Sequence, residues 1–157
     1  MVALAEEQTK SEAPELELPG LNDPGLYFNR ELQDIQFDGW VLEEALDARH
    51  PLLERVKFAA IFADNLDEYF MIRVSGLRRQ YIAGVVKTPP DGMTPAEQLM
   101  AIRRELTPKL KRHADCWHDD LLPKLHKEGI QILNYDDLKR KQRKLLRRYC
   151  LLYTSDA

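Results

Sequence analysis

The sequence lacks the features that mark several classes of protein. It has no apolar run of about 18 residues, the length that a membrane-spanning helix needs. Residues 1–10 lack the basic start and the apolar stretch of a secretory signal. The two cysteines, Cys116 and Cys150, have no metal-binding spacing and no neighbouring thiol in sequence. These absences predict a cytoplasmic protein with free thiols and no integral membrane segment.

Motifs for catalysis and for metal binding are also missing. There is no Gly-rich phosphate loop, no His-Glu-x-x-His and no Gly-x-Ser-x-Gly. His113 and His118 are five apart on an expected helix and do not share a face, and the adjacent Asp119 and Asp120 diverge. We therefore predict no catalytic residue and no metal site in this chain. By themselves, the residues indicate an α-helical binding or assembly module.

Charge is unevenly distributed along the 157 residues, of which 44% are hydrophobic and 31% charged. The net charge is −3, yet residues 1–23 carry six acidic residues against one lysine, and residues 139–148 carry seven basic residues and no acid. Such asymmetry could steer a polyanion, although a solvated helix face is the commoner cause of a charge run. We predict no nucleic-acid partner.

Helical spacing begins after a leader. Residues 1–25 are rich in Glu, Pro and Gly, which predicts a disordered segment. Asn29 is a candidate N-cap for a first helix whose apolar positions recur three to four apart. This helix should end near Asp47, because His50 precedes a proline.

The second and third helices are expected to meet at Asn65. Pro51 suits the opening of the second helix, which we expect to stop at residues 63–64. Asn65 then serves as the N-cap of a third helix, with Glu68 reaching back to complete a capping box. Gly84 should end that helix.

A long helix is expected next, and after it the spacing of the apolar residues changes from that of a helix to that of a strand. Thr94 and Glu97 offer a capping box for a helix that runs to Gly129, with Pro108 and Pro123 expected to kink or split it. Residues 130–133 have strand character, and Asp136 or Asp137 can start another helix. The prediction is an all-α amino-terminal helical bundle over residues 26–128, followed over 129–157 by the first β-α piece of a truncated α/β head domain.

Three motifs carry a resemblance to a known family. They are Phe-Asn-Arg-Glu-Leu at residues 28–32, Pro-Leu-Leu-Glu-Arg at 51–55 and Asn-Leu-Asp-Glu-Tyr-Phe at 65–70. Residues 26–80 closely resemble the amino-terminal domain of the polyphosphate kinase family, the bacterial enzymes that reversibly transfer the terminal phosphate of ATP to polyphosphate. The resemblance continues more weakly to residue 149, through residues 121–133, where family members enter the head domain.

The resemblance implies an enzyme class and its partners. The chain is expected to be the amino-terminal part of a phosphotransferase that acts on ATP, ADP and polyphosphate through a phosphohistidine. That histidine and the ligands of Mg²⁺ would lie outside this chain, so the fragment alone should be inactive. A homo-oligomer in the cytoplasm, including one peripheral to the membrane in a polyphosphate kinase complex, is implied as well. The alternative is a non-catalytic helical module for assembly.

The resemblance also implies site residues. It places Asn65 at the adenine side of ATP, and an Asn side chain offers the donor and the acceptor that an adenine edge requires; the alternative is a helix cap only. Arg73, Arg78 and Arg79 could face polyphosphate, since a guanidinium suits phosphate, although a solvated face or salt bridges would explain them too.

The first helix departs from the family pattern in two places. Gln33-Asp34-Ile35 stands where the family usually has Ser-Trp-Leu, and Phe37-Asp38-Gly39-Trp40 where it has Phe-Asn-x-Arg. The loss of an aromatic residue at Asp34 puts the packing of this helix in doubt. Gly39 should weaken the helix by about 1 kcal/mol relative to alanine.

Overall fold

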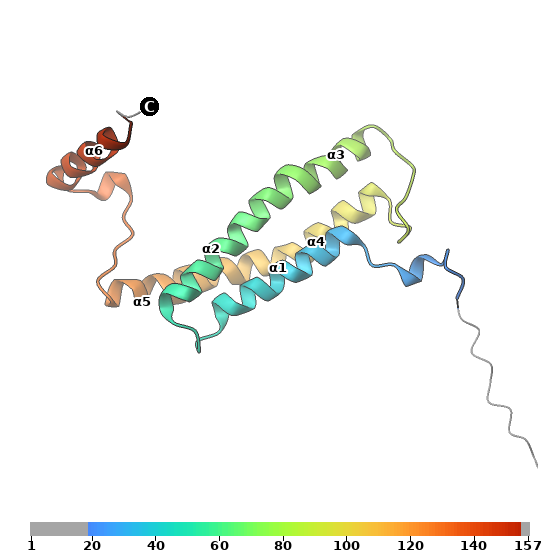
Figure 1. Ribbon diagram of the computed structural model, residues 1–157, viewed down its shortest axis with the longest axis horizontal. Coiled ribbons are helices and arrows are strands. Elements are labelled where there is room, and N and C mark those ends of the chain that lie inside the picture. Colours follow the sequence, from blue (N-terminus) through green and yellow to red (C-terminus); the bar gives the residue numbers. More distant parts are fainter. Residues whose placement is uncertain (1–18, 155–157) are drawn as a thin grey trace, which may run out of the picture.

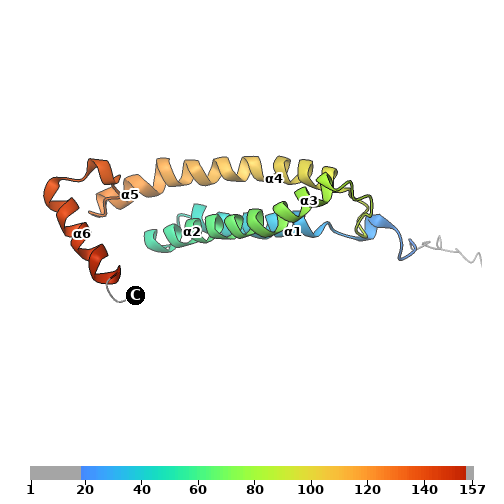
Figure 2. The ribbon, with the colours of Figure 1, turned by 90° about the horizontal axis from the view of Figure 1, so that it is seen from above.

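The computed structural model describes residues 19–154, with side chains through residue 150, and this part of the chain is helical without a strand. Three rods form its body: α1 (Arg30–Leu46); α2 (Leu52–Glu68), η2 (Tyr69–Val74) and α3 (Ser75–Ile82) in line; and α4 (Pro95–Asp115), η3 (Cys116–Leu121) and α5 (Leu122–Lys127) in line. Figures 1 and 2 show the rods running side by side in an elongated bundle. Short 3-10 turns, η1 (Pro24–Leu26) and η4 (Tyr135–Asp137), precede α1 and the last helix, α6 (Arg140–Thr154). Residues 1–18 of the predicted leader lie outside the described residues.

Most helix boundaries follow the local signals in the sequence. Asn29 caps α1, its Oδ1 accepting the N–H of Leu32 over 3.1 Å, and Asp47 is the C-cap. Thr94 and Glu97 form the predicted capping box of α4. Gly84 and Gly129 follow α3 and α5 with φ of 64° and 81°, a region in which glycine is favoured. These starts and stops were correctly predicted because each depends on one or two neighbouring residues.

The predicted cap at Asn65 is wrong. The residue lies inside α2, and its side chain makes no capping bond. Between residues 61 and 73 no glycine or proline breaks the chain, and the buried positions Phe62, Leu66 and Tyr69 keep helical spacing across the expected stop. Burial of a continuous apolar face outweighs the weak local preference of Asn for a cap. The second and third predicted helices therefore form one rod.

Two π-helical stretches shift the faces of the long rods. At η2 Tyr69 is buried, while the next residue, Phe70, is 44% exposed. A π turn holds an extra residue and so rotates the side chains that follow it. Pro108 lies within α4 without ending it, whereas Pro123 follows η3 and occupies an early position of α5, where its missing N–H costs least. The long rod is therefore not split at either proline; its α-helical pattern is interrupted by the π-helical stretch η3, just before Pro123.

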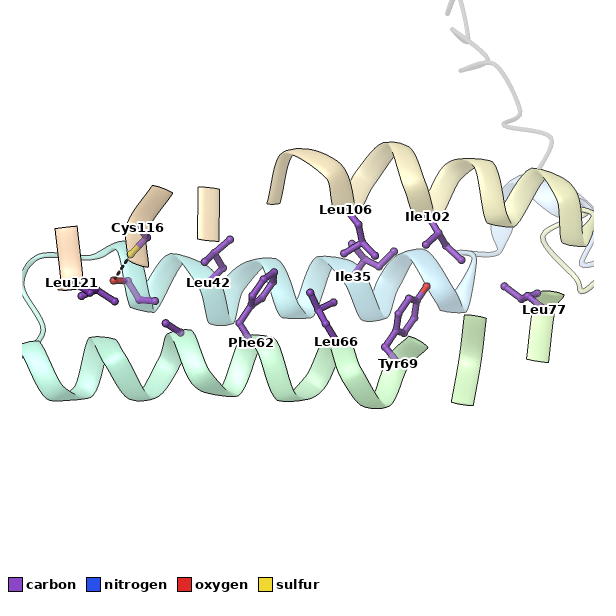
Figure 3. Packing of buried hydrophobic residues seen from close by; sticks show 12 residues of the cluster. Ile35, Leu42, Phe62, Leu66, Tyr69, Leu77, Ile102, Leu106, Cys116 and Leu121 are labelled. Atoms are coloured by element: carbon purple, nitrogen blue, oxygen red, sulfur yellow. Dashed lines mark hydrogen bonds between the residues drawn. The ribbon is translucent and has the colours of Figure 1, made fainter. Parts of the chain in front are cut away.

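The hydrophobic core lies where the three rods meet. Figure 3 shows Ile35 and Leu42 of α1, Phe62 of α2, Leu106 of α4 and Leu121 of η3 pointing into the same layer. Tyr69 and Leu77 also belong to the core cluster, and they extend this layer toward α3. The core holds α1 and α2 in a fixed register, and the site described below depends on that register.

The carboxyl-terminal segment differs from its prediction. Residues 130–133 have no regular structure, so the predicted strand is wrong for this part of the chain. An isolated strand has no partner for its backbone N–H and C=O groups, and the described residues supply none. The helix after it forms, but it begins at Arg140, beyond the 3-10 turn that contains Asp136 and Asp137. A β-α head piece is therefore not observed, although Figure 1 shows α6 standing apart from the bundle.

Candidate functional site

A polar pocket of about 340 Å³ lies between α1 and the rod formed by α2 and η2. One face of α1 and one face of the α2–η2 rod supply its walls, because residues three and four apart lie on the same side of a helix. It is lined by Arg30, Asp34, Phe37, Asp38, Asn65, Glu68, Tyr69, Ile72 and Arg73. We call this set the Asn65 pocket.

Asn65 is joined to Asp38 at the base of this pocket. Its Nδ2 donates to Oδ1 of Asp38 over 2.9 Å, and Asp38 is only 5% exposed. Burial raises the pKa of Asp38 above its ordinary value, the hydrogen bond from Asn65 opposes that shift, and the nearby Asp34 adds to it. Within residues 19–150, Oδ1 of Asn65 accepts no hydrogen bond. The amide therefore keeps an acceptor for a ligand.

Arg73 is already paired with a carboxylate. Its Nε and Nη2 donate to the two oxygens of Glu31 over 2.9 and 2.7 Å, and Asp34 lies 3.9 Å from Nε. The pair raises the pKa of Arg73. The carboxylate of Glu31 neutralises the charge of this bidentate guanidinium, so Arg73 attracts a phosphate less strongly than an unpaired arginine would.

Arg78 and Arg79 lie apart from the Asn65 pocket. Both are exposed on α3, beside a shallow groove of about 590 Å³ that Met71, Val74, Ser75 and Ile82 also line. Neither forms an ion pair within the described part of the chain. The structure thus brings Arg73 and Asn65 together and leaves Arg78 and Arg79 on another surface.

The lining of the Asn65 pocket suits a flat, neutral and polar ring. Phe37, Tyr69 and Ile72 give apolar surface, while Asp34, Asp38 and Glu68 outnumber the arginines of the wall. Burial, and next to it the charge of Glu31, raises the pKa of Tyr69, so its phenol stays protonated at neutral pH. A triphosphate would meet net negative charge here, whereas a heterocycle could contact both the apolar wall and the amide.

A second polar cluster, which we call the Arg55 cluster, lies at the other end of α2. Arg55 is 4% exposed; its Nε donates to the backbone oxygen of Ala45 over 2.8 Å, and its Nη2 donates to Asp120 over 2.6 Å. Asp120 also pairs with Lys124, and the Sγ of Cys116 lies 4.0 Å from Arg55. All members contact other parts of the protein, which indicates a structural role.

Sequence reasoning did not identify Asp38 or Arg55 as functional or structural centres. Each carries a readable signal, because Asp38 follows Ile35 by three residues, and Arg55 precedes Ala59 by four, on the buried face of its helix. A charged residue in register with core positions needs a partner. The identity of that partner depends on another helix, which the spacing alone does not reveal.

Other kinds of site are absent from the described residues. No group of three or more His, Cys, Asp or Glu side chains in residues 19–150 could hold a metal ion. His113 instead lies against Phe62 and the backbone oxygen of Ala59. No helix within residues 19–154 is long and apolar enough to cross a membrane.

Comparisons with known proteins agree on one family. Residues 27–133 match the model of the polyphosphate kinase N-terminal domain. The chain is 49% identical over 127 residues to polyphosphate kinase 1 of Chlorobaculum tepidum, covering 80% of this chain and 18% of that relative. It is 44% identical over 147 residues to the polyphosphate kinase of Prosthecochloris aestuarii, covering 93% of this chain and 21% of the relative. No solved structure matches.

The chain spans about a fifth of the length of these curated relatives. The match lies over the helical bundle and stops at residue 133, where the strand was expected. It includes every residue of the Asn65 pocket and of the Arg55 cluster. The chain therefore belongs to the polyphosphate kinase family, a family of phosphotransferases, and carries its amino-terminal domain.

Proposed function

We propose that this chain contributes the adenine-side contact for ATP in a polyphosphate kinase, with Asn65 as the contacting residue. The observation that supports the proposal most is the free Oδ1 of Asn65 at the base of a pocket with apolar walls and an excess of acids. The complete enzyme would transfer the terminal phosphate of ATP reversibly to polyphosphate. The phosphohistidine and the ligands of Mg²⁺ belong to other parts of that enzyme, which works in the cytoplasm.

The geometry supports the base rather than the phosphates as the bound group. An Asn amide can pair with a donor and an acceptor on the edge of adenine at once. Phe37 and Ile72 are 56% and 58% exposed, which leaves apolar surface available to a purine ring. The phosphates would extend away from the pocket, toward arginines and Mg²⁺ held elsewhere.

The test is a chimera in which residues 27–133 replace the matching segment of the Chlorobaculum tepidum enzyme. In this background, Asn65→Ala should raise the KM for ATP about tenfold, the order expected for losing a paired amide contact. The KM for polyphosphate should stay the same. Asp67→Ala is the matched control, because Asp67 is exposed on the same helix and does not line the pocket.

The melting temperature of each variant is measured beside the kinetics, because Asn65→Ala leaves Asp38 without its donor. Assays are run well below that temperature, so that loss of folded enzyme does not imitate weaker binding. An unchanged KM for ATP in the folded Asn65→Ala chimera refutes the adenine role of Asn65.

Exposed apolar side chains favour a second candidate function, assembly with another copy of the chain. Met71 and Ile82 are 70% and 72% exposed and lie on the same groove beside Arg78 and Arg79. Exposed apolar surface of this kind often marks an interface. Sedimentation of the 157-residue chain tests it: self-association should weaken in Met71→Ser/Ile82→Ser, and a chain that is monomeric before substitution contradicts this function.

A further inference from the structure

The Asp38–Asn65 hydrogen bond has a direction, because its two partners differ in what they can do. An ionised carboxylate only accepts hydrogen bonds, whereas the amide of Asn65 has a donating and an accepting side. Asp38 is buried, and its Oδ1 lies 2.9 Å from the Nδ2 of Asn65. The nitrogen side of the amide must therefore face Asp38, and the oxygen side must face away from it.

The opposite orientation of the amide is unfavourable for a clear reason. If the amide turned over, its oxygen would lie against the carboxylate oxygen of Asp38, two acceptors at hydrogen-bond distance with no proton between them. Asp34, another acid of the pocket, adds negative charge near Asp38 and offers no donor. A buried acceptor without a donor is costly, so the turned amide would be rare.

The fixed orientation determines what Asn65 offers to a ligand. Its Oδ1 is free to accept, and Nδ2 keeps one hydrogen that is not used by Asp38. The adenine edge presents an exocyclic amino donor next to a ring-nitrogen acceptor, which matches this pair of groups. Guanine and hypoxanthine present a carbonyl oxygen at the place of the amino group, and that oxygen would lie against the Oδ1 of Asn65.

We propose that Asp38 is a positioning residue that orients the amide of Asn65 and thereby selects purines with an exocyclic amino group over those with a carbonyl. The inference rests on the proposed contact between Asn65 and the base. It adds that the selectivity for the base depends on a residue that need not touch the nucleotide.

The experiment compares ATP with inosine triphosphate, because hypoxanthine replaces the amino group with a carbonyl and leaves the rest of the base nearly unchanged. The ratio of kcat/KM for the two nucleotides is measured in the chimera that carries residues 27–133. Asp38→Asn keeps the size of the side chain but lets the pair of amides bond in either direction. This variant should lower the ratio about tenfold, the order of one paired edge contact.

Two further variants show that the effect comes from the direction of the bond. Asp67→Asn removes the same charge from an exposed position outside the pocket and should leave the ratio unchanged. The exchange Asp38→Asn/Asn65→Asp restores a donor–acceptor pair with its direction reversed, but it leaves only carboxylate acceptors toward the base and removes the hydrogen that Nδ2 offers to the ring nitrogen. The exchange should therefore recover stability but not the ratio of the parent, whereas a merely structural role for the pair predicts that both recover.

The outcomes separate this inference from the proposal on which it rests. If Asn65→Ala leaves the KM for ATP unchanged, the contact with the base is wrong. If Asn65→Ala raises that KM while Asp38→Asn leaves the ratio for the two nucleotides unchanged, Asn65 binds ATP but Asp38 does not select the base. An exchange variant that folds and regains the ratio of the parent also overturns the inference, and it keeps the test decisive where the single variant is poorly folded.

Discussion

The Arg55 cluster and the Asn65 pocket are both polar and both lie where α1 meets α2, yet they differ in the bonds that remain open. Arg55 donates to a backbone oxygen and to Asp120, and Asp120 has a further partner in Lys124. Asn65 gives one bond to Asp38 and keeps its oxygen free beside a hollow. A buried polar group is therefore not by itself a sign of a site; unused hydrogen-bonding capacity beside open space is the better sign.

The largest expected effect is on stability, at the Arg55 cluster. Arg55→Ala leaves the backbone oxygen of Ala45 with only the weak Sγ–H donor of Cys116 and opens a cavity at a 4% exposed position, so it should lower the free energy of unfolding by about 3 kcal/mol. Urea denaturation of the 157-residue chain measures it. Arg49→Ala is the control, because the Arg49 side chain is 90% exposed and its ion pair lies in solvent, where it should change stability little. Equal losses in the two variants would contradict the structural assignment of Arg55.

The next largest effect on stability is expected at the Asn65 pocket, where a substitution adds a second carboxylate beside Asp38. Asn65→Asp sets two carboxylates at the distance of the present hydrogen bond, and we expect a loss of about 2 kcal/mol at neutral pH. Adding Asp38→Asn should restore most of it, since one amide then faces one carboxylate again. The double-mutant cycle in urea measures the coupling. Additive losses would mean that the two side chains do not contact each other in solution.

The two clusters should also respond to pH in opposite directions. Lys124, and next to it Arg55, lower the pKa of Asp120, so its contribution is present above the ordinary value of 3.8 and is lost as pH falls through the lowered value. Burial raises the pKa of Asp38, so its contribution is present below 3.8 and is lost as pH rises through the raised value.

Urea midpoints between about pH 2 and pH 7 compare these two contributions. As the pH falls at the acid end of this range, the free energy of unfolding should drop less steeply in Asp120→Asn than in the parent. As the pH rises from 3.8 to neutral, it should drop less in Asp38→Asn than in the parent. If both variants flatten the same part of the curve, the two carboxylates do not differ as the structure indicates.

The sequence predicts the local parts of this fold and misses the parts that depend on a second helix. The caps at Asn29 and Thr94 were correct because each uses bonds within one turn. The cap at Asn65 was wrong because the buried face of α2 continues past it into η2. The strand at residues 130–133 was wrong because no segment within residues 19–154 pairs with it.

The candidate site was predicted only in part, for the same reason. The resemblance named Asn65, but the spacing of α1 gave no reason to pair it with Asp38. That pairing depends on how far α1 is rotated against α2, and the core between Ile35, Leu42 and Phe62 fixes this rotation. The residue on which the proposed selectivity depends could be recognised only once the two helices were seen together.

The smallest expected effect concerns the arginines that lie outside both clusters. Arg78→Ala and Arg79→Ala should each change stability by less than about 0.5 kcal/mol, because both side chains are exposed and form no ion pair in the described residues. If they face polyphosphate, the double variant in the chimera should raise the KM for polyphosphate about twofold, and the rise should shrink with added salt as screening increases.

Arg73 completes this comparison, because its charge is already matched by Glu31. Arg73→Gln should therefore cost stability, by about 1 kcal/mol, and leave the KM for polyphosphate unchanged. Arg103→Ala, at an exposed position on α4, controls for the loss of one positive charge. A salt-dependent rise in the KM for Arg73→Gln that exceeds the rise for Arg78→Ala/Arg79→Ala would assign phosphate contact to the Asn65 pocket. The pocket would then contact polyphosphate as well as the base, because an arginine that releases Glu31 on binding can use its charge on the ligand.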